Sequence, residues 1–488
     1  MRMAYADVIA LLAEGRCSVQ VDSRKIAPGD VFVAVTGENE DGARYIPQAI
    51  ERGARYIVLP SDREIALPET IGVCPVSDTR EAVAELARAR FHTGERKIKI
   101  LGITGTNGKT TCAALLEHLL RACGHTVGVL GTVTYRWPGH LEAAPLTTPG
   151  PLQLHEMLAA MDEAGCDYCV MEVSSHALAQ KRVAGLSFSG AALTNLTQDH
   201  LDFHGTMENY FAAKAKLFCE LPDKKKAMAI NCDDPYGRRL LALCPDALPY
   251  GLSAGSCERL PRLSAELIEN DIHGLRLRMH YMGQSTGTES WDLHSPLLGA
   301  FNAANLLTVQ ALALGLGFQS SDLAVLSSFT GVCGRLERVP CGGKHVFVDY
   351  AHTPDALVNV LKAIRDAGFT RIITVFGCGG NRDRTKRPRM GEAVAKNSDI
   401  AIVTSDNPRF EDPMSIIQDI LPGMKDAKEY SVQPDRRKAT EQALALATDA
   451  RDCVLIAGKG HEDYQIIQGE RRHYSDQEVV RAYAKAKG

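Results

Sequence analysis

The feature that most constrains the fold of this chain is a repeated alternation of short apolar runs with helical patterns along its 488 residues. Apolar runs of strand length that lack polar residues are typical of strands buried on both faces, as in a parallel sheet covered by helices. In the first two thirds of the chain we predict such strands at Val31–Val35, Tyr56–Leu59, Ile100–Ile103, Val127–Leu130, Tyr168–Val173, Ala191–Leu193 and Met228–Ile230. The pattern therefore predicts an α/β fold.

Four further strands are predicted after Gly331, at Val346–Val348, Arg371–Phe376, Ile400–Thr404 and Cys453–Ala457. Each of them runs directly into polar or glycine-rich residues. Ligands of open α/β sheets bind beyond the carboxyl ends of the strands. We therefore expect the segments that follow these four strands to converge on one site.

Length and pattern together predict three α/β domains. A polar stretch, Arg90–Lys99, follows the first block of strands and helices, and a helical pattern at Asn302–Leu316 closes the second. The predicted domains are residues 1–93, 94–331 and 332–488.

Composition excludes several functional classes. The chain has 55 Lys and Arg against 59 Asp and Glu, a formal net charge of −4, which argues against a dedicated nucleic-acid-binding protein. No apolar run is long enough to span a bilayer, and the N-terminus does not resemble a secretory signal, so we expect no membrane insertion. Fourteen scattered cysteines suggest free thiols in a cytoplasmic protein.

The strongest local motif is the loop Gly105–Thr111, which lies between a predicted buried strand and an amphipathic helix. Glycines at such a helix N-terminus allow backbone N–H groups to surround phosphates. Lys109 would reach the β- and γ-phosphates, and the Thr110 hydroxyl would bind Mg²⁺. The match is imperfect, because Ile103 occupies the position of the first glycine in the strict pattern. The alternative is an ordinary helix-start loop.

Two strand ends near this loop carry possible metal ligands. Glu172 ends one predicted strand and is followed by Ser174-Ser-His176, while Asp199–His204 follows another. His200 and His204 alone could suggest zinc, but oxygen ligands beside a phosphate loop favour Mg²⁺ with one imidazole. The pair Cys166 and Cys169 lacks a second pair at zinc spacing, and we interpret it as structural.

The C-terminal third carries a basic run and a candidate amino-acid pocket. Asn381–Arg389 contains five basic residues and one acid, which indicates either a solvated loop or a site for a small anion. Asp406-Asn-Pro-Arg409 combines a carboxylate with a guanidinium, a pair that can hold both ends of a zwitterion. The alternative for this second motif is a plain Asn-Pro turn.

Together these segments resemble the Mur ligase family. The resemblance covers nearly the whole chain and rests on Asp22-Ser-Arg24, Pro28–Ala34, Gly105–Thr111, Met171–His176, Asp349–Pro354, Asp406–Arg409 and Gly458–Tyr464. It implies a three-domain architecture with a UDP-substrate-binding N-terminal domain, a central P-loop-type ATP-binding sheet and a Rossmann-like C-terminal amino-acid-binding domain.

The resemblance also implies an activity. ATP would phosphorylate the D-glutamate carboxylate of UDP-N-acetylmuramoyl-L-alanyl-D-glutamate, and the amine of meso-2,6-diaminopimelate would attack the acyl phosphate. Positioning and charge neutralisation dominate such a phosphoryl transfer. The implied setting is cytoplasmic peptidoglycan precursor synthesis by a monomer that uses ATP, Mg²⁺ and small-molecule substrates.

The family roles fall on specific residues of this sequence. The implied catalytic residues are Lys109, Glu172, His200 and Lys214, and the implied Mg²⁺ ligands are Thr110, Glu172, His200 and Lys214, the last as an N6-carboxylysine. By pattern alone, Lys214 would be a helix-surface residue. The implied ATP contacts are Gly105, Thr106, Asn107, Gly108, Lys109, Thr110, Thr111, Asn302, Arg335 and Asp349.

Two further substrate sites are carried over in the same way. The UDP-substrate contacts are Val21, Ser23, Thr147, Thr148, Ser174, Gln180 and Arg182. Leu146 stands where the family has Asn, and the family contacts at Glu38, Asn39 and Glu40 would place two acids near a diphosphate. The diaminopimelate contacts are Arg382, Asp406, Asn407, Pro408, Arg409, Gly458 and Glu462.

Three other functions remain possible from the sequence. The same ligation could use L-lysine, although Arg409 suits the distal carboxylate of diaminopimelate, unless it only braces the Asn407-Pro408 turn. A folylpolyglutamate synthase-like ligase shares the phosphate loop but not the N-terminal block. A nucleotide-dependent switch would need no amino-acid pocket.

Overall fold

The computed structural model describes residues 3–37, 41–63, 65–252, 262–283 and 287–487, with the backbone alone for residues 222–226. The chain forms two compact units. The first contains residues 1–264, 281–288 and 305–323, and the second contains residues 265–280, 289–304 and 324–488.

The N-terminal part of the first unit is a four-stranded parallel sheet of order β1-β2-β3-β4. Alternate residues of its strands face opposite sides: Val31 and Val33 pack with α1 and α3, whereas Phe32 packs with α2. The helices and strands are α1 Tyr5–Ala13, β1 Val19–Gln20, β2 Val31–Val33, α2 Ile46–Glu51, β3 Tyr56–Pro60, β4 Gly72–Val76 and α3 Thr79–Phe91.

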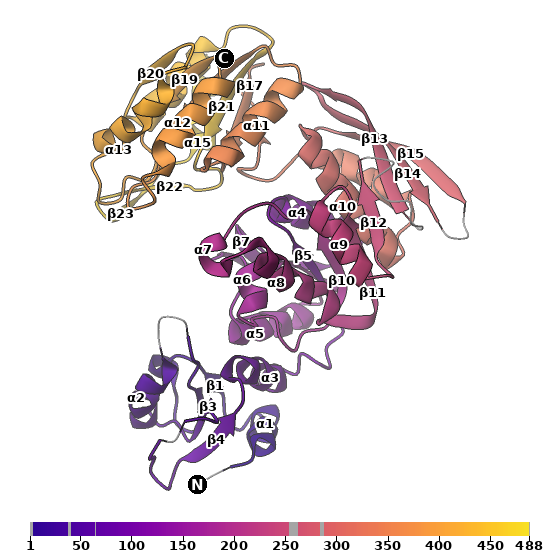
Figure 1. Cartoon of the computed structure of the whole chain (residues 1–488), viewed down its shortest axis with the longest axis vertical. Coiled ribbons are helices and arrows are strands. Elements are labelled where there is room, and N and C mark those ends of the chain that lie inside the picture. Colours follow the sequence, from indigo (N-terminus) through magenta and orange to yellow (C-terminus); the bar gives the residue numbers. More distant parts are fainter. Residues whose placement is uncertain (1–2, 38–40, 64, 253–261, 284–286, 488) are drawn as a thin grey trace. The chain divides into compact units, whose positions relative to one another are not determined.

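A larger sheet has the strand order β15-β14-β13-β12-β11-β10-β5-β9-β6-β7-β8. Its middle strands are parallel, and β5 pairs with β10 on one side and with β9 on the other; β5, β10 and β11 are labelled in Figure 1. The strands are β5 Lys99–Thr104, β6 Val127–Leu130, β7 Thr134–Trp137, β8 His140–Ala143, β9 Tyr168–Glu172, β10 Phe188–Leu193, β11 Pro222–Asn231, β12 Leu248–Gly251, β13 Arg262–Asp271, β14 Gly274–Met282 and β15 Thr288–Ser295.

Helices α4 to α9 lie between strands of this sheet along the chain, and α10 follows its last strand. They are α4 Lys109–Ala122, α5 Pro151–Glu163, α6 Ser175–Ala179, α7 Leu201–His204, α8 Met207–Cys219, α9 Pro235–Leu243 and α10 Ala300–Leu316. Because β5 is central, the loop after it is flanked by the ends of β9 and β10. The fold therefore brings the predicted phosphate loop beside Glu172 and Thr194.

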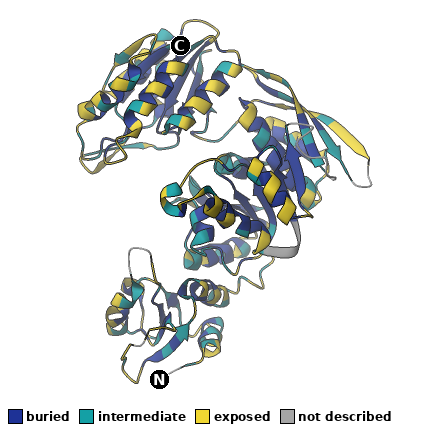
Figure 2. Cartoon of the chain, viewed as in Figure 1, coloured by how far each residue is buried: buried dark blue, intermediate teal, exposed yellow. Residues whose placement is uncertain are grey.

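The C-terminal sheet has the order β16-β17-β21-β18-β19-β20 and is parallel except for β16. Its four middle strands are mostly dark blue in Figure 2, and the outer faces of its helices are yellow. The elements are β16 Glu337–Arg338, β17 His345–Asp349, α11 Pro354–Asp366, β18 Arg371–Phe376, α12 Lys386–Asn397, β19 Ile400–Val403, α13 Pro413–Ile420, β20 Tyr430–Val432, α14 Arg436–Leu446, β21 Asp452–Ala457 and α15 Asp476–Lys487, with a separate hairpin of β22 Tyr464–Ile467 and β23 Glu470–His473.

Helices cover both faces of this last sheet. Phe347, Ile372 and Leu455 pack with α11, α12 and α13, whereas Val346, Ile373 and Val454 pack with α14 and α15. The four strands predicted to converge, β17, β21, β18 and β19, are adjacent, so their carboxyl ends meet at one edge. This confirms the α/β fold with parallel sheets.

Candidate functional site

The loop after β5 has the backbone conformation that its glycines allow. Gly105 and Gly108 have φ of +146° and +87°, and α4 begins at the next residue, Lys109. A Cβ at Gly105 would lie 1.9 Å from Thr194 Oγ1, and one at Gly108 would lie 2.3 Å from Asn305 Oδ1. Glycine is therefore required at both positions.

The neighbouring strand end holds this loop through Asn195. The amide N–H of Asn107 donates to Asn195 Oδ1 at 3.0 Å, and the amide N–H of Thr106 donates to the Asn195 carbonyl at 2.9 Å. Thr106 Oγ1 also lies 3.1 Å from the Tyr210 hydroxyl. Asn195 lies two residues beyond Leu193, the last residue of the apolar strand β10. This position at a strand end was the sequence signal for its role.

Side chains of cation-binding and phosphate-binding type meet at the start of α4. Thr110 Oγ1 donates to Glu172 Oε2 at 3.0 Å, and Lys109 Nζ donates to the carbonyls of Gly105 and Thr106 at 2.9 Å each. Glu172 is 1% exposed and also accepts from the amide and hydroxyl of Thr132, each at 2.9 Å. The structure thus brings together the predicted Lys109, Thr110 and Glu172.

Thr132 was missed by the sequence reasoning, although it stands two residues beyond the end of β6. Its position at the end of a buried strand was the available signal. Hard oxygen atoms that could coordinate a cation meet here: the hydroxyls of Thr110 and Thr132 and the carboxylate of Glu172. Such oxygen ligands fit Mg²⁺. Among the described residues, no group of three or more His, Cys, Asp and Glu side chains is placed to hold a metal by itself.

Lys214 is the main correction to the residue pattern. It was expected on a helix surface, but it is 2% exposed on α8, a helix that is buried on several sides. Its Nζ donates to the Gly105 carbonyl at 2.8 Å, and its pKa is held well below the usual lysine value by burial and then by Lys109. The amine therefore reaches the phosphate loop and favours its neutral form.

His200 is exposed and directly precedes α7. It has φ of +52°, and its Nε2 is 3.4 Å from Asp199 Oδ2. Its ring centroid is 4.7 Å from that of His176 and 6.3 Å from that of Tyr210. His204 is buried instead, donates or accepts at Ser175 Oγ, and has its pKa lowered chiefly by burial.

Most of the residues expected to contact the muramoyl-peptide lie together beyond β9. Thr148 Oγ1 donates to the Glu172 carbonyl at 2.8 Å and accepts from the Ser174 amide at 3.0 Å. Arg182 donates to Gln180 Oε1 and, at 3.1 Å, to the Thr148 carbonyl. Thr147 Oγ1 is 3.2 Å from Thr132 Oγ1, which links this cluster to Glu172.

The N-terminal contacts are placed separately. Val21 is 45% exposed, and Ser23 is buried with its hydroxyl donating to Gln48 Oε1 at 2.6 Å.

The side chain of Leu146, where the family has Asn, is exposed, and the backbone carbonyl of Leu146 accepts from the Tyr135 hydroxyl. The expected contacts at Glu38, Asn39 and Glu40 lie outside the described residues.

Three further predicted ATP contacts belong to the second unit. Asn302 is buried and donates to the Leu298 carbonyl at 2.9 Å, and the guanidinium of Arg335 lies 5.0 Å from the centre of the Tyr350 ring. Both Asp349 carboxylate oxygens accept backbone amides, from Leu336 at 2.6 Å and Ala351 at 2.7 Å. Burial raises the pKa of this carboxyl above its usual value.

The candidate amino-acid pocket is assembled at the carboxyl ends of β18, β19 and β21. Asn407 Nδ2 donates to Glu462 Oε2 at 2.8 Å, and a Cβ at Gly458, which has φ of +114°, would lie 2.7 Å from Asp406 Oδ2. Arg409, with φ of +55°, donates from Nη1 to the Gly380 carbonyl at 2.7 Å. Arg409 thus braces the glycine turn, and it remains partly exposed.

The basic run near this pocket is only partly a solvated loop. Arg382 is exposed, but Arg387 lies in the first turn of α12, is 1% exposed and pairs with both oxygens of Glu411 at 2.8 and 2.9 Å and with Asp419 at 2.8 Å. Glu411 also accepts from the amide of Asn381. The solvated-loop alternative therefore does not hold for Arg387, because its pairs with Glu411 and Asp419 replace its solvent contacts.

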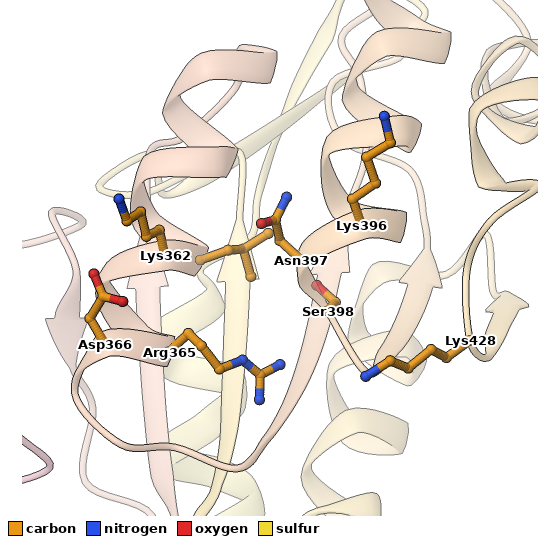
Figure 3. Close-up of a pocket in the computed structure, with 8 residues that line it drawn as sticks. Lys362, Arg365, Asp366, Lys396, Asn397, Ser398 and Lys428 are labelled. Atoms are coloured by element: carbon orange, nitrogen blue, oxygen red, sulfur yellow. The ribbon is translucent and has the colours of Figure 1, made fainter.

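A cavity of about 280 Å³ lies away from this pocket, beside the ends of α11 and α12 that precede β18 and β19 (Figure 3). Basic side chains line it, but Arg365 and Lys428 both pair with Asp399, at 2.6 and 2.7 Å.

Among the described residues, no helix is long and apolar enough to cross a membrane, and the cysteines are free thiols.

The chain matches known proteins over most of its length. Three family models match: the Mur ligase family catalytic domain at residues 18–91, the Mur ligase middle domain at 103–313, and the Mur ligase glutamate ligase domain at 334–460. The chain is similar to the UDP-N-acetylmuramoyl-L-alanyl-D-glutamate--2,6-diaminopimelate ligase of Lawsonia intracellularis, with 50% identity over 94% of each chain.

Two other relatives carry the same name. The ligase of Gloeobacter violaceus is 46% identical over 95% of this chain and 92% of its own. A solved structure of a UDP-N-acetylmuramoyl-L-alanyl-D-glutamate--2,6-diaminopimelate ligase is 32% identical, covers 96% of this chain and 95% of its own, and has a TM-score of 0.71. The three-domain Mur ligase architecture expected from the sequence agrees with these matches. The chain belongs to the Mur ligase family.

Proposed function

We propose that the chain is an ATP-dependent ligase that adds meso-2,6-diaminopimelate to UDP-N-acetylmuramoyl-L-alanyl-D-glutamate in cytoplasmic peptidoglycan precursor synthesis. The observation that carries the proposal is that one chain holds both a phosphate loop with Thr110 on Glu172 and a pocket of mixed charge at Asp406–Arg409. A nucleotide switch needs only the first of these. The names of the relatives favour diaminopimelate over the folylpolyglutamate-type alternative.

The first step is phosphorylation of the D-glutamate carboxylate by ATP. Backbone N–H groups of Gly105–Thr111 and the ammonium of Lys109 would bind the β- and γ-phosphates, which requires Lys109 to exchange its two carbonyl contacts for phosphate oxygens. Mg²⁺ held by Thr110, Glu172, His200 and carbamylated Lys214 would neutralise charge on the transferred group. Asn302, Arg335 and Asp349 are the proposed remaining ATP contacts.

Burial of Lys214 supports the carbamate. A lysine must be neutral to react with CO₂, and the lowered pKa of Lys214 provides the neutral amine. The carbamate would place an anion beside Lys109, where an ammonium would be repelled, and it would supply a further oxygen ligand. This modification is a proposal that rests on the family resemblance together with the burial.

The second step is attack of an amine on the acyl phosphate, which releases phosphate and forms the amide. Arg409 and Arg382 would bind carboxylates of diaminopimelate, Asp406 and Glu462 would bind ammonium groups, and Asn407, Pro408 and Gly458 would shape the pocket. Val21, Ser23, Thr147, Thr148, Ser174, Gln180 and Arg182 would hold the UDP-linked peptide. We further propose domains at 1–93, 94–331 and 332–488 and a monomeric state.

A phosphate-release assay tests the function. We expect ATP hydrolysis to need both the UDP-linked dipeptide and diaminopimelate, and the product to gain the mass of one diaminopimelate residue. In a panel of amino acids, diaminopimelate should give the highest kcat/KM. A preference for L-lysine, or phosphate release with ATP alone, would refute the proposal.

A further inference from the structure

Lys459 is a fully buried lysine in the loop that follows β21, and none of the substrate roles above uses it. Its side chain is 0% exposed. It stands between Gly458 and Gly460, whose φ values are +114° and +54°. This loop belongs to the candidate amino-acid pocket, so a buried cation here lies directly behind the groups expected to bind the incoming amino acid.

The ammonium of Lys459 contacts three polar side chains of that pocket. Nζ lies 3.3 Å from Asp406 Oδ1, 3.1 Å from Asn407 Oδ1 and 3.4 Å from Glu462 Oε2. An ammonium has three N–H donors, so these three acceptors use all of them. The side chain is therefore directed at the pocket residues and at no solvent-facing group.

The same contact fixes the orientation of the Asn407 amide. Its Oδ1 accepts from Lys459 Nζ and, at 3.0 Å, from the Ile466 amide, so its Nδ2 is left to donate to Glu462 Oε2 at 2.8 Å. Without the Lys459 ammonium, Oδ1 of Asn407 would accept from the Ile466 amide alone, and the orientation of the side-chain amide would be less well fixed. Lys459 thus orders both Asn407 and the carboxylate that Asn407 holds.

Other residues hold the backbone of this loop. Arg436 donates to the carbonyl of Ala457 at 3.0 Å and pairs with Asp476 in a fully buried ion pair at 2.8 Å. Gln477 donates to the Gly460 carbonyl at 3.0 Å. Because α14 and α15 already fix the loop on both sides of Lys459, its charge is not needed to close the turn.

The charges around Lys459 determine what the pocket can accept. Asp406 and Glu462 carry two negative charges and Lys459 one positive charge, which leaves one net negative charge in this group. The other titratable or charged groups that face it are Tyr464, whose ring centre is 5.7 Å from Nζ, Tyr350, Cys378 and Arg436. Burial raises the pKa of both tyrosines and of Cys378, so they are neutral at physiological pH.

We propose that Lys459 is a positioning residue for the amino-acid substrate: its ammonium holds the side chains of Asp406, Asn407 and Glu462 in place and so prepares the pocket for one ammonium group of a diamino acid. This rests on the proposed function of the pocket. Without Lys459, the carboxylates of Asp406 and Glu462 would lie close together with no cation between them, and their mutual repulsion would displace them.

The test uses the full chain with Lys459→Met, which keeps the length of the side chain and removes its charge. We expect the KM for diaminopimelate to rise about 10- to 100-fold, as for the loss of a hydrogen bond to a charged group. The KM for ATP and for the UDP-linked dipeptide should stay within about twofold of wild type. Lys396→Met, at an exposed lysine of α12 paired with Glu392, is the matched control.

The comparison of KM with kcat, together with a variant that keeps the charge, separates this role from a merely structural one. In Lys459→Met the KM for diaminopimelate should rise while kcat at saturating diaminopimelate stays within about threefold of wild type, because binding and not phosphoryl transfer depends on Lys459. Lys459→Arg keeps a positive charge and should have a KM for diaminopimelate closer to that of wild type. If Lys459→Met does not fold, as judged by thermal unfolding, Lys459→Gln is measured in the same way.

The outcomes are distinct. An unchanged KM for diaminopimelate in a folded uncharged variant, or a KM raised equally in Lys459→Arg, would overturn the proposal. An equal loss in the KM for ATP would also overturn it, because that would indicate general damage. If wild type does not ligate diaminopimelate at all, the proposed function is wrong, and direct binding of diaminopimelate to wild type and Lys459→Met then tests the pocket alone.

Discussion

The phosphate loop and the amino-acid pocket are built by different means. The loop is one contiguous segment, and its shape depends on positive φ at Gly105 and Gly108 and on backbone groups that Asn195 holds. The pocket is assembled from the ends of three strands by buried charged side chains, with Lys459 between Asp406 and Glu462. A substitution in the loop should therefore act by misplacing the bound phosphate. A substitution in the pocket should act by changing the balance of its charges.

The largest effect expected is at the phosphate loop. Lys109→Ala should reduce ligation at least about 100-fold in kcat, because it removes the preorganised cation that would meet the transferred phosphate. Phosphate release under saturating substrates measures it. Lys97→Ala, at an exposed lysine just before β5, is the control and should leave the rate unchanged. Near-normal turnover in Lys109→Ala would show that the loop does not bind the reacting phosphate.

The next largest effect concerns the buried lysine of α8. Lys214→Ala should be nearly inactive, and short carboxylates should restore part of the activity, since they can refill the position of the carbamate anion. Lys216→Ala on the same helix should behave as wild type. An unmodified ammonium at Lys214 in a metal-loaded crystal structure, or the absence of rescue, would contradict the carbamate.

In the pocket, Arg409→Ala should act on substrate preference more than on rate. We expect the KM for diaminopimelate to rise about 10- to 100-fold, the usual loss for a charge-assisted hydrogen bond, while turnover of L-lysine changes little. The ratio of kcat/KM for the two amino acids measures this, with the exposed Arg437→Ala as control. If the ratio does not change, Arg409 only braces the turn through Gly380.

The smallest effect is expected at Thr132. Thr132→Val removes one of the hydroxyl donors to Glu172 but keeps the size of the side chain and the backbone N–H donor. A single lost hydrogen bond of this kind should lower kcat about 5- to 10-fold. The apparent Mg²⁺ requirement, measured in the same assay, should rise. A Mg²⁺ dependence equal to that of wild type would place the cation away from Glu172.

Several parts of the fold and the site followed from local patterns. Gly105–Thr111 could be recognised because its chemistry lies within seven consecutive residues between a strand and a helix. The carboxyl ends of β17, β18, β19 and β21 could be expected to meet because parallel strands share one edge, and the structure confirms this. In both cases the relevant geometry is fixed by neighbours in sequence or by the direction of the strands.

Other parts could not be predicted from local pattern. A lysine in a helix usually faces solvent, so nothing in the periodicity of α8 indicated that Lys214 is buried against the Gly105 carbonyl. The same holds for Arg387, whose partners Glu411 and Asp419 are 24 and 32 residues away. Burial of a charge depends on partners supplied by tertiary contacts, and these have no fixed spacing in the sequence.

The sequence by itself determined the α/β class, the glycine loop Gly105–Thr111 and the family, because strand period, glycine spacing and ordered motifs are properties of contiguous residues. Only the tertiary structure decided which charges are buried and how they are balanced: Thr110 on Glu172, Lys214 on Gly105, and Lys459 among Asp406, Asn407 and Glu462. The physical reason is that the energy of a buried charge is set by the groups within a few ångströms of it, and folding brings those groups together from distant parts of the chain.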